Sequence, residues 1–231
     1  MKKSLLLISA FSLLVSCKST EQKLYTSTTK NPKHLSKWAV VNGEWTAQDT
    51  LLEGTKNQYW AIVNLHKKLP DNYSIRFSSQ VKDGTYLFEV MLDLKDQAFV
   101  GILYNTLDKK IQIEDRKLYS AKEAEKENAY IRTKNHIGQL PKYELKPSTK
   151  WVDWKIEKRN NQLYIWINQE EYVHYQNNHN LLQTKGQLGF AINGNAKIKN
   201  IVITPLKQAD LLSPVEFKGK PKVLPFFLFS E

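Results

Sequence analysis

The sequence predicts an all-β fold, an antiparallel β-sandwich with one short surface helix. Three observations support this prediction. Short stretches alternate apolar and polar residues with a period of two, which is the pattern of a strand with one buried face. Turn-forming residues, chiefly Asn, Gly and Asp, separate these stretches. The chain also contains 11 Tyr, 6 Trp and 9 Phe in 231 residues, and aromatic residues are enriched in strands.

The clearest alternation lies between Trp151 and Leu206. Asn-containing turns separate its strands, since Asn tolerates the left-handed conformation that tight hairpins need. We therefore predict an antiparallel meander followed by one more hairpin, with Asn193-Gly194-Asn195 as its turn. The expected strands are Trp151–Lys158, Leu163–Asn168, Tyr172–Tyr175, Gln187–Ile192 and Ala196–Thr204.

Residues from Trp38 onward supply the rest of the sandwich. The pair Asn42-Gly43 is a tight-turn signal between two short apolar stretches. Polar turns separate the strands that follow. These strands are expected at Tyr59–Leu65, Tyr73–Val81, Thr85–Leu94, Phe99–Tyr104 and Lys110–Arg116.

The strand Thr85–Leu94 carries the most information about a site. Its alternate residues from Tyr86 to Leu94 are apolar and are expected to face the core. The opposite face then carries Glu89 and Asp93 on one side of the sheet. These two carboxylates lie about 13 Å apart along a strand, so each needs a catalytic partner from a neighbouring strand.

Two segments are expected outside the sheets. Ser120–Asn128 consists of helix-favouring, mostly charged residues and predicts a short surface helix. Tyr130–Lys150 contains Gly138, Pro141 and Pro147 and is predicted to be a long loop. Such loops lie at the rims of sandwiches and often shape the site.

The N-terminus has the layout of a bacterial lipoprotein signal. Lys2 and Lys3 precede the apolar stretch Leu5–Val15, and Ser16-Cys17 stands where an exported chain would be cleaved. The apolar run is shorter than the ~20 residues that span a bilayer as a helix. We therefore predict that Cys17 is lipidated and anchors the chain in the bacterial cell envelope, with the outer membrane as the expected location.

These observations divide the chain into a signal at 1–17, a flexible tether at 18–37, the β-sandwich at 38–206 and a tail at 207–231. Cys17 is the only cysteine, so its lipidation leaves no disulfide and no thiolate metal ligand. The tail ends in the apolar run Leu224–Phe229. That run is expected to dock as an extra strand or on a partner.

Both ends of the sandwich resemble one family. The late block reads W-x-x-W-x-I-E-x-x-x-N-x-L-x-I-W-I-N, then G-Q-L-G-F-x-x-x-G-N, then I-K-N-I-x-I. The opening from Trp38 reads W-x-x-x-N-G-x-W-x-x-x-D-x-x-L-x-G. Both patterns are similar to the 3-keto-disaccharide hydrolase domain family. The resemblance implies a concanavalin-A-like jelly roll, shared with laminin-G-like modules and laminarinase-type hydrolases, and an activity on 3-keto-sugar glycosides.

Carboxylates are the candidate catalytic residues. Glycosidic hydrolysis usually needs two of them, roughly 5–5.5 Å apart for retention of configuration or 6.5–9.5 Å for inversion. The alternative for each is a place on a solvated strand face. The candidates are Glu89, Asp93, Glu114 and Asp115.

The strand Lys110–Arg116 resembles the central strand of that family, E-x-Q-I-x-D. The resemblance assigns Gln112 and Asp115 to the Gln and Asp of the motif, whereas Ile111 or Lys110 replaces its Glu. Aromatic rings elsewhere could stack on the apolar face of a sugar, with core packing as the alternative. The candidate ligand-binding residues are Gln112, Arg116, Tyr104, Trp60, Trp166 and Tyr164.

No cofactor and no metal site is expected, although Asn193-Gly194-Asn195 leaves a structural calcium as an alternative. The formal charge is +11, but the lysines are scattered and no nucleic-acid motif accompanies them. The expected partners are therefore a glycan and, through the anchor, a membrane, and the chain is expected to be a monomer. Three functions stay open: a glycan-binding lipoprotein, a glycoside hydrolase, and a structural or adhesion lipoprotein.

Overall fold

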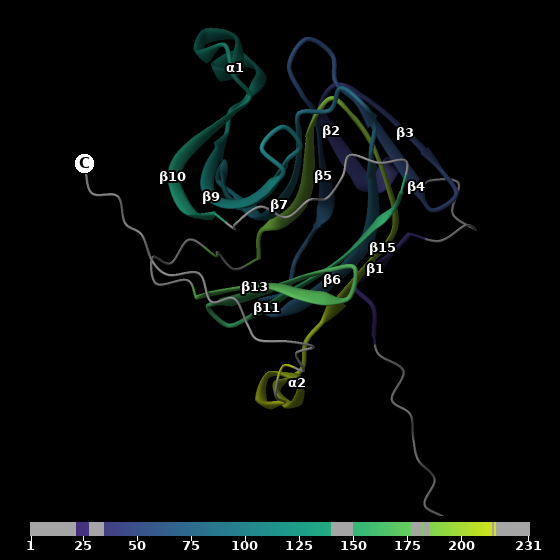
Figure 1. Ribbon diagram of the computed structural model, residues 1–231, viewed down its shortest axis with the longest axis vertical. Helices are drawn as coiled ribbons and strands as arrows, with labels where there is room; N and C mark the ends of the chain where they lie inside the picture. Colours follow the sequence, from purple (N-terminus) through teal and green to yellow (C-terminus); the bar gives the residue numbers. More distant parts are fainter. Residues whose placement is uncertain are drawn as a thin grey trace, which may run out of the picture.

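The computed structural model describes residues 22–27, 35–139, 150–176, 182, 185–213 and 215. Two antiparallel β-sheets pack face to face in it (Figure 1), which confirms the predicted sandwich. We refer to them as sheet A and sheet B. The N-terminal strands of the domain lie beside its C-terminal strands in both sheets, as a jelly roll requires.

Sheet A has one edge made by the predicted meander. Its spatial order is β13 (Glu170–Gln176), β12 (Gln162–Ile167), β11 (Val152–Arg159), β6 (Tyr73–Val81), β15 (Asn195–Pro205), β4 (Leu51–Thr55) and β3 (Glu44–Gln48), and β1 (Tyr25–Thr26) also pairs with β15. Asn160, with φ 55°, turns β11 into β12, and Asn168, with φ 51°, turns β12 into β13. The meander and its Asn turns are thus confirmed.

Sheet B contains the more strongly bent strands (Figure 1). Its order is β10 (Ile131–Gln139), β9 (Lys110–Leu118), β8 (Ala98–Asn105), β7 (Leu87–Lys95), β14 (Gln187–Asn193), β5 (Ala61–Lys68) and β2 (Trp38–Asn42). A 3₁₀ turn (Leu35–Lys37) precedes β2, α1 (Ala121–Glu127) joins β9 to β10, and α2 (Gln208–Leu212) follows β15. The predicted surface helix is therefore present, and Ser120 and Glu123 form its capping box.

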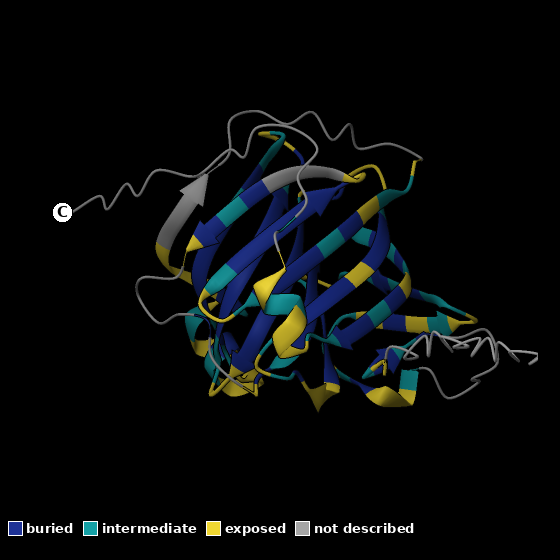
Figure 2. Cartoon of the chain, turned by 90° about the horizontal axis from the view of Figure 1, so that it is seen from below, coloured by how far each residue is buried: buried dark blue, intermediate teal, exposed yellow. Residues whose placement is uncertain are grey.

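The core lies between the inner faces of the two sheets. Alternate residues of the facing strands fill it, and the rings of Phe77, Phe88, Trp154 and Phe190 meet at its centre. Figure 2 shows the buried segments running through the middles of the strands, with exposed residues in the turns and in α2. The period-two pattern therefore identified the inner faces correctly at these positions.

The predicted hairpin around Asn193-Gly194-Asn195 is wrong, because β14 belongs to sheet B and β15 to sheet A. The turn at Asn42-Gly43 likewise passes from β2 in sheet B to β3 in sheet A. Both glycines have positive φ, 77° at Gly43 and 144° at Gly194. An Asn-Gly pair allows a sharp reversal in either arrangement, so the local signal does not say whether the second strand pairs with the first or crosses to the other sheet.

Two other expectations need correction. The predicted loop Tyr130–Lys150 contains an edge strand, β10, which pairs with β9 along Ile131–Gln139. The predicted tether at 18–37 contains β1, whose Tyr25 and Thr26 pair with Ile203 and Val202 of β15. The predictions for Cys17 and for the apolar run at 224–229 fall outside the described residues.

Candidate functional site

The outer face of sheet B is the candidate site. Figure 1 shows β9 and β10 curling away from sheet A toward α1, which makes this outer face concave. Since Phe88, Val90 and Ile113 point into the core, the residues that alternate with them point to the concave face. Pairing places Glu114 of β9 opposite Gly101 of β8, while Glu89 of β7 lies opposite Leu103, two residues further along β8 on the same face.

Three buried side chains form an ion cluster on this face. Arg116 Nε lies 3.2 Å from Glu89 Oε1, and Arg116 Nη2 donates to Glu89 Oε2 at 3.4 Å. Arg116 Nη1 donates to Glu114 Oε2 at 2.5 Å and to Thr133 Oγ1 at 2.8 Å. Thr133 in turn donates to Glu114 Oε2 at 2.7 Å. One guanidinium therefore serves two carboxylates, and an exposed hydroxyl of β10 links the cluster to solvent.

Gly101 makes room for this cluster. A Cβ at this position would lie 2.2 Å from Glu89 Oε1 and 3.1 Å from Arg116 Cγ. Gly in the interior of a strand weakens the sheet and often marks a close approach of another group. The glycine is thus explained by the carboxylate that occupies the space of its missing side chain.

Burial changes the acidity of Glu89. Its side chain is 0% exposed, and this burial raises its pKa to about 7, while the Arg116 guanidinium lowers it and the Glu114 carboxylate raises it further. The pKa of Glu89 therefore lies nearer to neutral pH than that of an ordinary carboxyl group. A carboxyl group with such a pKa can donate or accept a proton under ordinary conditions.

One buried polar atom of the concave face stands outside the ion cluster. Asn64 Oδ1 makes no hydrogen bond within the described part of the chain, whereas Glu89 Oε1 and Arg116 Nε, which also make none, pair with each other at 3.2 Å. The Asn64 side chain lies against Gly189, where an added Cβ would be only 2.6 Å from Asn64 Oδ1. Buried polar atoms are nearly always hydrogen bonded, so Asn64 Oδ1 indicates capacity for one additional hydrogen-bond donor.

An apolar patch adjoins the ion cluster and is covered at one side by the α1 segment. Ile62, Met91 and Phe99 belong to this patch. The ring of Tyr130, just after α1, is tilted against that of Tyr59 with 6.1 Å between the ring centroids, and the Tyr59 hydroxyl donates to Asn128 Oδ1 at 2.8 Å. Segments far apart in sequence thus meet across the concave face. The other members of the patch are Leu94, Leu118, Ile131 and Ala191, with Val41 and Trp60 beside them.

Asp93 does not share the face of Glu89, so that prediction is wrong. Asp93 has φ 53°, and the pairing of β7 with β8 shifts between Leu92 and Lys95. This β-bulge reverses the alternation. Asp93 consequently points between the sheets and pairs with Lys158 Nζ of β11 at 2.6 Å. Tyr86, predicted to face the core, is 45% exposed.

Asp115 also lies apart from the ion cluster. It follows Glu114 on β9 and therefore points to the opposite face. Its carboxylate accepts a hydrogen bond from Asn135 Nδ2 at 3.3 Å, and its charge raises the pKa of Tyr175 on sheet A, which burial raises more strongly, to about 12. Only Glu89 and Glu114 of the four predicted acids come together, joined by Arg116.

The predicted aromatic platform is divided among three places. Tyr104 is part of the core, and Trp60 is half-buried beside the apolar patch of the concave face. Tyr164 and Trp166 lie on sheet A, where His174 stacks on Tyr164 at 4.5 Å and Lys155 Nζ lies 4.1 Å from the Trp166 ring. Gln112, by contrast, lies on the concave face and is partly exposed, next to Leu103 of β8.

Sequence reasoning missed Thr133, Asn64 and Gly101. The available signal was the glycine inside the apolar strand Phe99–Tyr104.

Within the described ranges, no group of three His, Cys, Asp or Glu side chains is placed to hold a metal ion. At the turn where the sequence left calcium as an alternative, Asn193 Oδ1 accepts a hydrogen bond from the Lys56 ammonium at 3.0 Å. In the same ranges, no helix has the length and apolarity needed to cross a membrane.

Solved structures with the same fold are known, although no family model and no curated protein matches the chain. A galectin-like protein of unknown function from Bacillus subtilis is 12% identical with a TM-score of 0.61, over 80% of this chain and 97% of that chain. The carbohydrate-binding module CBM66 from Bacillus subtilis is 13% identical with a TM-score of 0.55, over 73% and 95%. A provisionally assigned glycosyl hydrolase from Parabacteroides distasonis is 14% identical with a TM-score of 0.52, over 74% and 89%. These likenesses establish the galectin-like jelly-roll fold.

Proposed function

We propose that this chain is a cell-envelope lipoprotein whose jelly-roll domain binds a carbohydrate on the concave face of sheet B. The observation that carries the proposal is the buried ion cluster of Glu89, Arg116 and Glu114, which lies beside the accessible polar side chains of Gln112 and Thr133. A saccharide supplies many hydroxyl groups that both donate and accept hydrogen bonds. The structural likeness to a carbohydrate-binding module supports this class of ligand.

Binding is tested with the full chain in detergent, first on a glycan array and then by calorimetry with the glycan that binds best. Gln112→Ala is expected to weaken binding about tenfold, the worth of roughly one hydrogen bond. Gln176→Ala, the same change at an exposed position on sheet A, is the control and is expected to bind normally. If no glycan binds, or if both variants weaken binding equally, the concave face is not the binding site.

The second candidate function is hydrolysis of a glycoside such as a 3-keto-disaccharide, as the family resemblance implies. The pKa of about 7 at Glu89, next to Glu114, favours it. In such a reaction one carboxyl group protonates the leaving oxygen and a carboxylate takes a proton from the attacking water. Release of sugar from keto-disaccharides would be lost in Glu89→Gln and kept in Asp93→Asn, whose side chain lies inside the sandwich. Turnover that survives Glu89→Gln would contradict this assignment.

The anchor is tested independently of the site. The intact mass of the purified protein is expected to show a chain that begins at Cys17 and carries acyl groups. Replacing Cys17 by Ser is expected to remove these groups, because the serine side chain has no thiol to be lipidated. An unmodified Cys17 in the mature protein would contradict the anchor and leave the glycan site unaffected. A protein that carries the lipid and binds no glycan would instead fit the structural or adhesion role.

A further inference from the structure

The short strand β1 fixes the start of the described chain to sheet A. Leu24 N donates to Ile203 O at 2.8 Å, and Ser27 N donates to Ile201 O at 2.9 Å, so hydrogen bonds hold β1 on both sides of Tyr25. The Tyr25 ring packs edge-on against Trp38, and its hydroxyl accepts a hydrogen bond from Trp38 Nε1 at 3.1 Å. Residues near 25 therefore belong to the folded domain.

This attachment shortens the connection to the proposed anchor. Lys23 is six residues after Cys17, and a fully extended chain spans at most ~3.5 Å per residue, so about 21 Å separates them at most. Without β1, a tether reaching to Trp38 would span about 70 Å. A lipidated Cys17 would consequently hold the surface around β1 close to the membrane.

A basic crevice lies next to β1. It has a volume of about 560 Å³, and Lys23, Lys37, His66 and Lys67 line it. Lys67 Nζ donates to Leu24 O at 3.0 Å, which fixes its ammonium beside the strand. The crevice is also lined by Thr26, whose buried hydroxyl makes no hydrogen bond within the described part of the chain.

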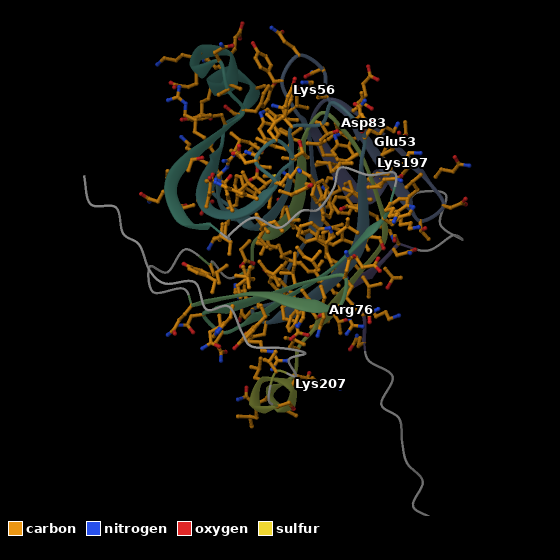
Figure 3. All side chains as sticks on the ribbon, viewed as in Figure 1. Glu53, Lys56, Arg76, Asp83, Lys197 and Lys207 are labelled. Carbon is orange, nitrogen blue, oxygen red and sulfur yellow. The ribbon has the colours of Figure 1, made fainter. Side chains whose placement is uncertain are left out.

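The lysines of this surface carry uncompensated charge. Lys23, Lys37, Lys67 and the adjacent Lys68 are exposed, and no carboxylate among the described residues forms an ion pair with any of them. Residues 22–24 leave the domain on the α2 side, away from α1 (Figure 1). Figure 3 places Arg76 and Lys207 on that side and Lys56 on the other. Arg76 and Lys207 thus add two positive charges on the side where the anchor would hold the domain.

We propose that the crevice formed by Lys23, Lys37, His66 and Lys67, with Lys68 beside it, binds the phosphate groups of anionic lipids in the membrane that carries the anchor. This inference rests on the proposed lipidation of Cys17, but not on the glycan site. Basic residues near an anionic surface favour binding, by about fivefold for each lysine. Docking on this side turns sheet A toward the membrane and leaves the concave face of sheet B open toward the opposite side.

The test uses the full mature chain in vesicles of phosphatidylcholine, alone or mixed with anionic phosphatidylglycerol. Acetylation of each lysine by a water-soluble reagent is then measured by mass spectrometry. Lys37 and Lys67 are expected to react about fivefold more slowly on anionic vesicles, and high salt is expected to abolish the difference. Lys122 and Lys126 on α1 are expected to react equally on both. Equal reactivity of Lys37 on both kinds of vesicle would overturn the proposal.

A charge-reversal pair provides the matched control. Lys23→Glu with Lys68→Glu is expected to remove the protection of Lys37 and Lys67, because the reversed charges are repelled by anionic lipid. Neither replaced side chain holds β1 in place, so the fold is expected to persist. Lys122→Glu with Lys126→Glu makes the same charge change on α1 and is expected to leave the protection intact.

Two further measurements distinguish membrane docking from binding of a free anion and from an effect of the anchor alone. Inorganic phosphate is added to the protein in detergent, and protection of Lys37 by phosphate alone would identify a site for a free anion and overturn membrane docking. The intact mass of the same sample reports on Cys17. If Cys17 is unmodified, the chain is added to the vesicles from outside, where the crevice lysines must still be protected on anionic lipid.

Discussion

Glu89 and Asp93 are four residues apart on β7, yet they lie on opposite sides of sheet B. Asp93 points between the sheets and has one cation, Lys158, at 2.6 Å. Glu89 points to the concave face and shares one cation, Arg116, with Glu114. The interior pair balances its charge, whereas the concave cluster has two carboxylates for one guanidinium. Burial alone therefore does not separate a structural carboxylate from a candidate site residue, whereas the balance of charge around the carboxylate does.

The largest expected effect comes from breaking the interior pair. Lys158→Met leaves Asp93 buried without its cation, and removing one partner of a buried ion pair costs about 3–5 kcal/mol. Urea unfolding measures this loss, and glycan binding by the still-folded protein is expected to be unchanged. The double variant Lys158→Met with Asp93→Leu is expected to recover most of the stability. If the double variant is no more stable than the single one, Asp93 does not depend on Lys158.

The pH dependence of stability separates the two carboxylates. Burial raises the pKa of Glu89 from 4.5 to about 7 and that of Asp93 from 3.8 to about 6. The folded state therefore binds more protons than the unfolded state between these values, so the free energy of unfolding falls as the pH rises. Each group contributes a fall of about 3 kcal/mol.

Urea unfolding at a series of pH values checks this prediction. Glu89→Gln is expected to remove the part of the decrease in unfolding free energy that extends to about pH 7. Asp93→Asn is expected to remove the part that ends near pH 6. A stability that is independent of pH in this window would show that neither carboxyl has a raised pKa.

Filling the space beside Glu89 is expected to have an intermediate effect. Gly101→Ala places a methyl group 2.2 Å from Glu89 Oε1, and overpacking of this kind costs about 1–3 kcal/mol. Glycan binding should weaken as well, because Arg116 must shift. The double variant Gly101→Ala with Glu89→Ala removes the clashing carboxylate. Its loss of stability should be smaller than the sum of the two single losses, and additive losses would argue against this contact.

The smallest expected effect is at the exposed edge of the cluster. Thr133→Val removes the hydroxyl that donates to Glu114 and accepts from Arg116, at a cost of about 1 kcal/mol in stability. Calorimetry with the best glycan is expected to show binding reduced about fivefold. Thr133→Ser keeps the hydroxyl and should behave like the unchanged protein. Equal behaviour of Val and Ser at this position would remove Thr133 from the site.

The sequence by itself determined most of the strands, although not β1 or β10, and the apolar face of most of them. That information is local, since a period of two reports one buried face wherever the strand lies. The face of Glu89, the meander that ends at Tyr175, and the helix after Ser120 could therefore be predicted from the sequence.

Only the tertiary structure decided which strands are neighbours and where the alternation is interrupted. The positive φ of Asp93 costs little for Asp, so no local signal marks the bulge that separates Asp93 from Glu89. The Asn-Gly turns at Gly43 and Gly194 suit a hairpin and a crossing between sheets equally well. Arg116 meets Glu89 only because β8 lies between β7 and β9 and has a glycine at that level. These outcomes depend on pairing between residues distant in sequence, which a local pattern does not encode.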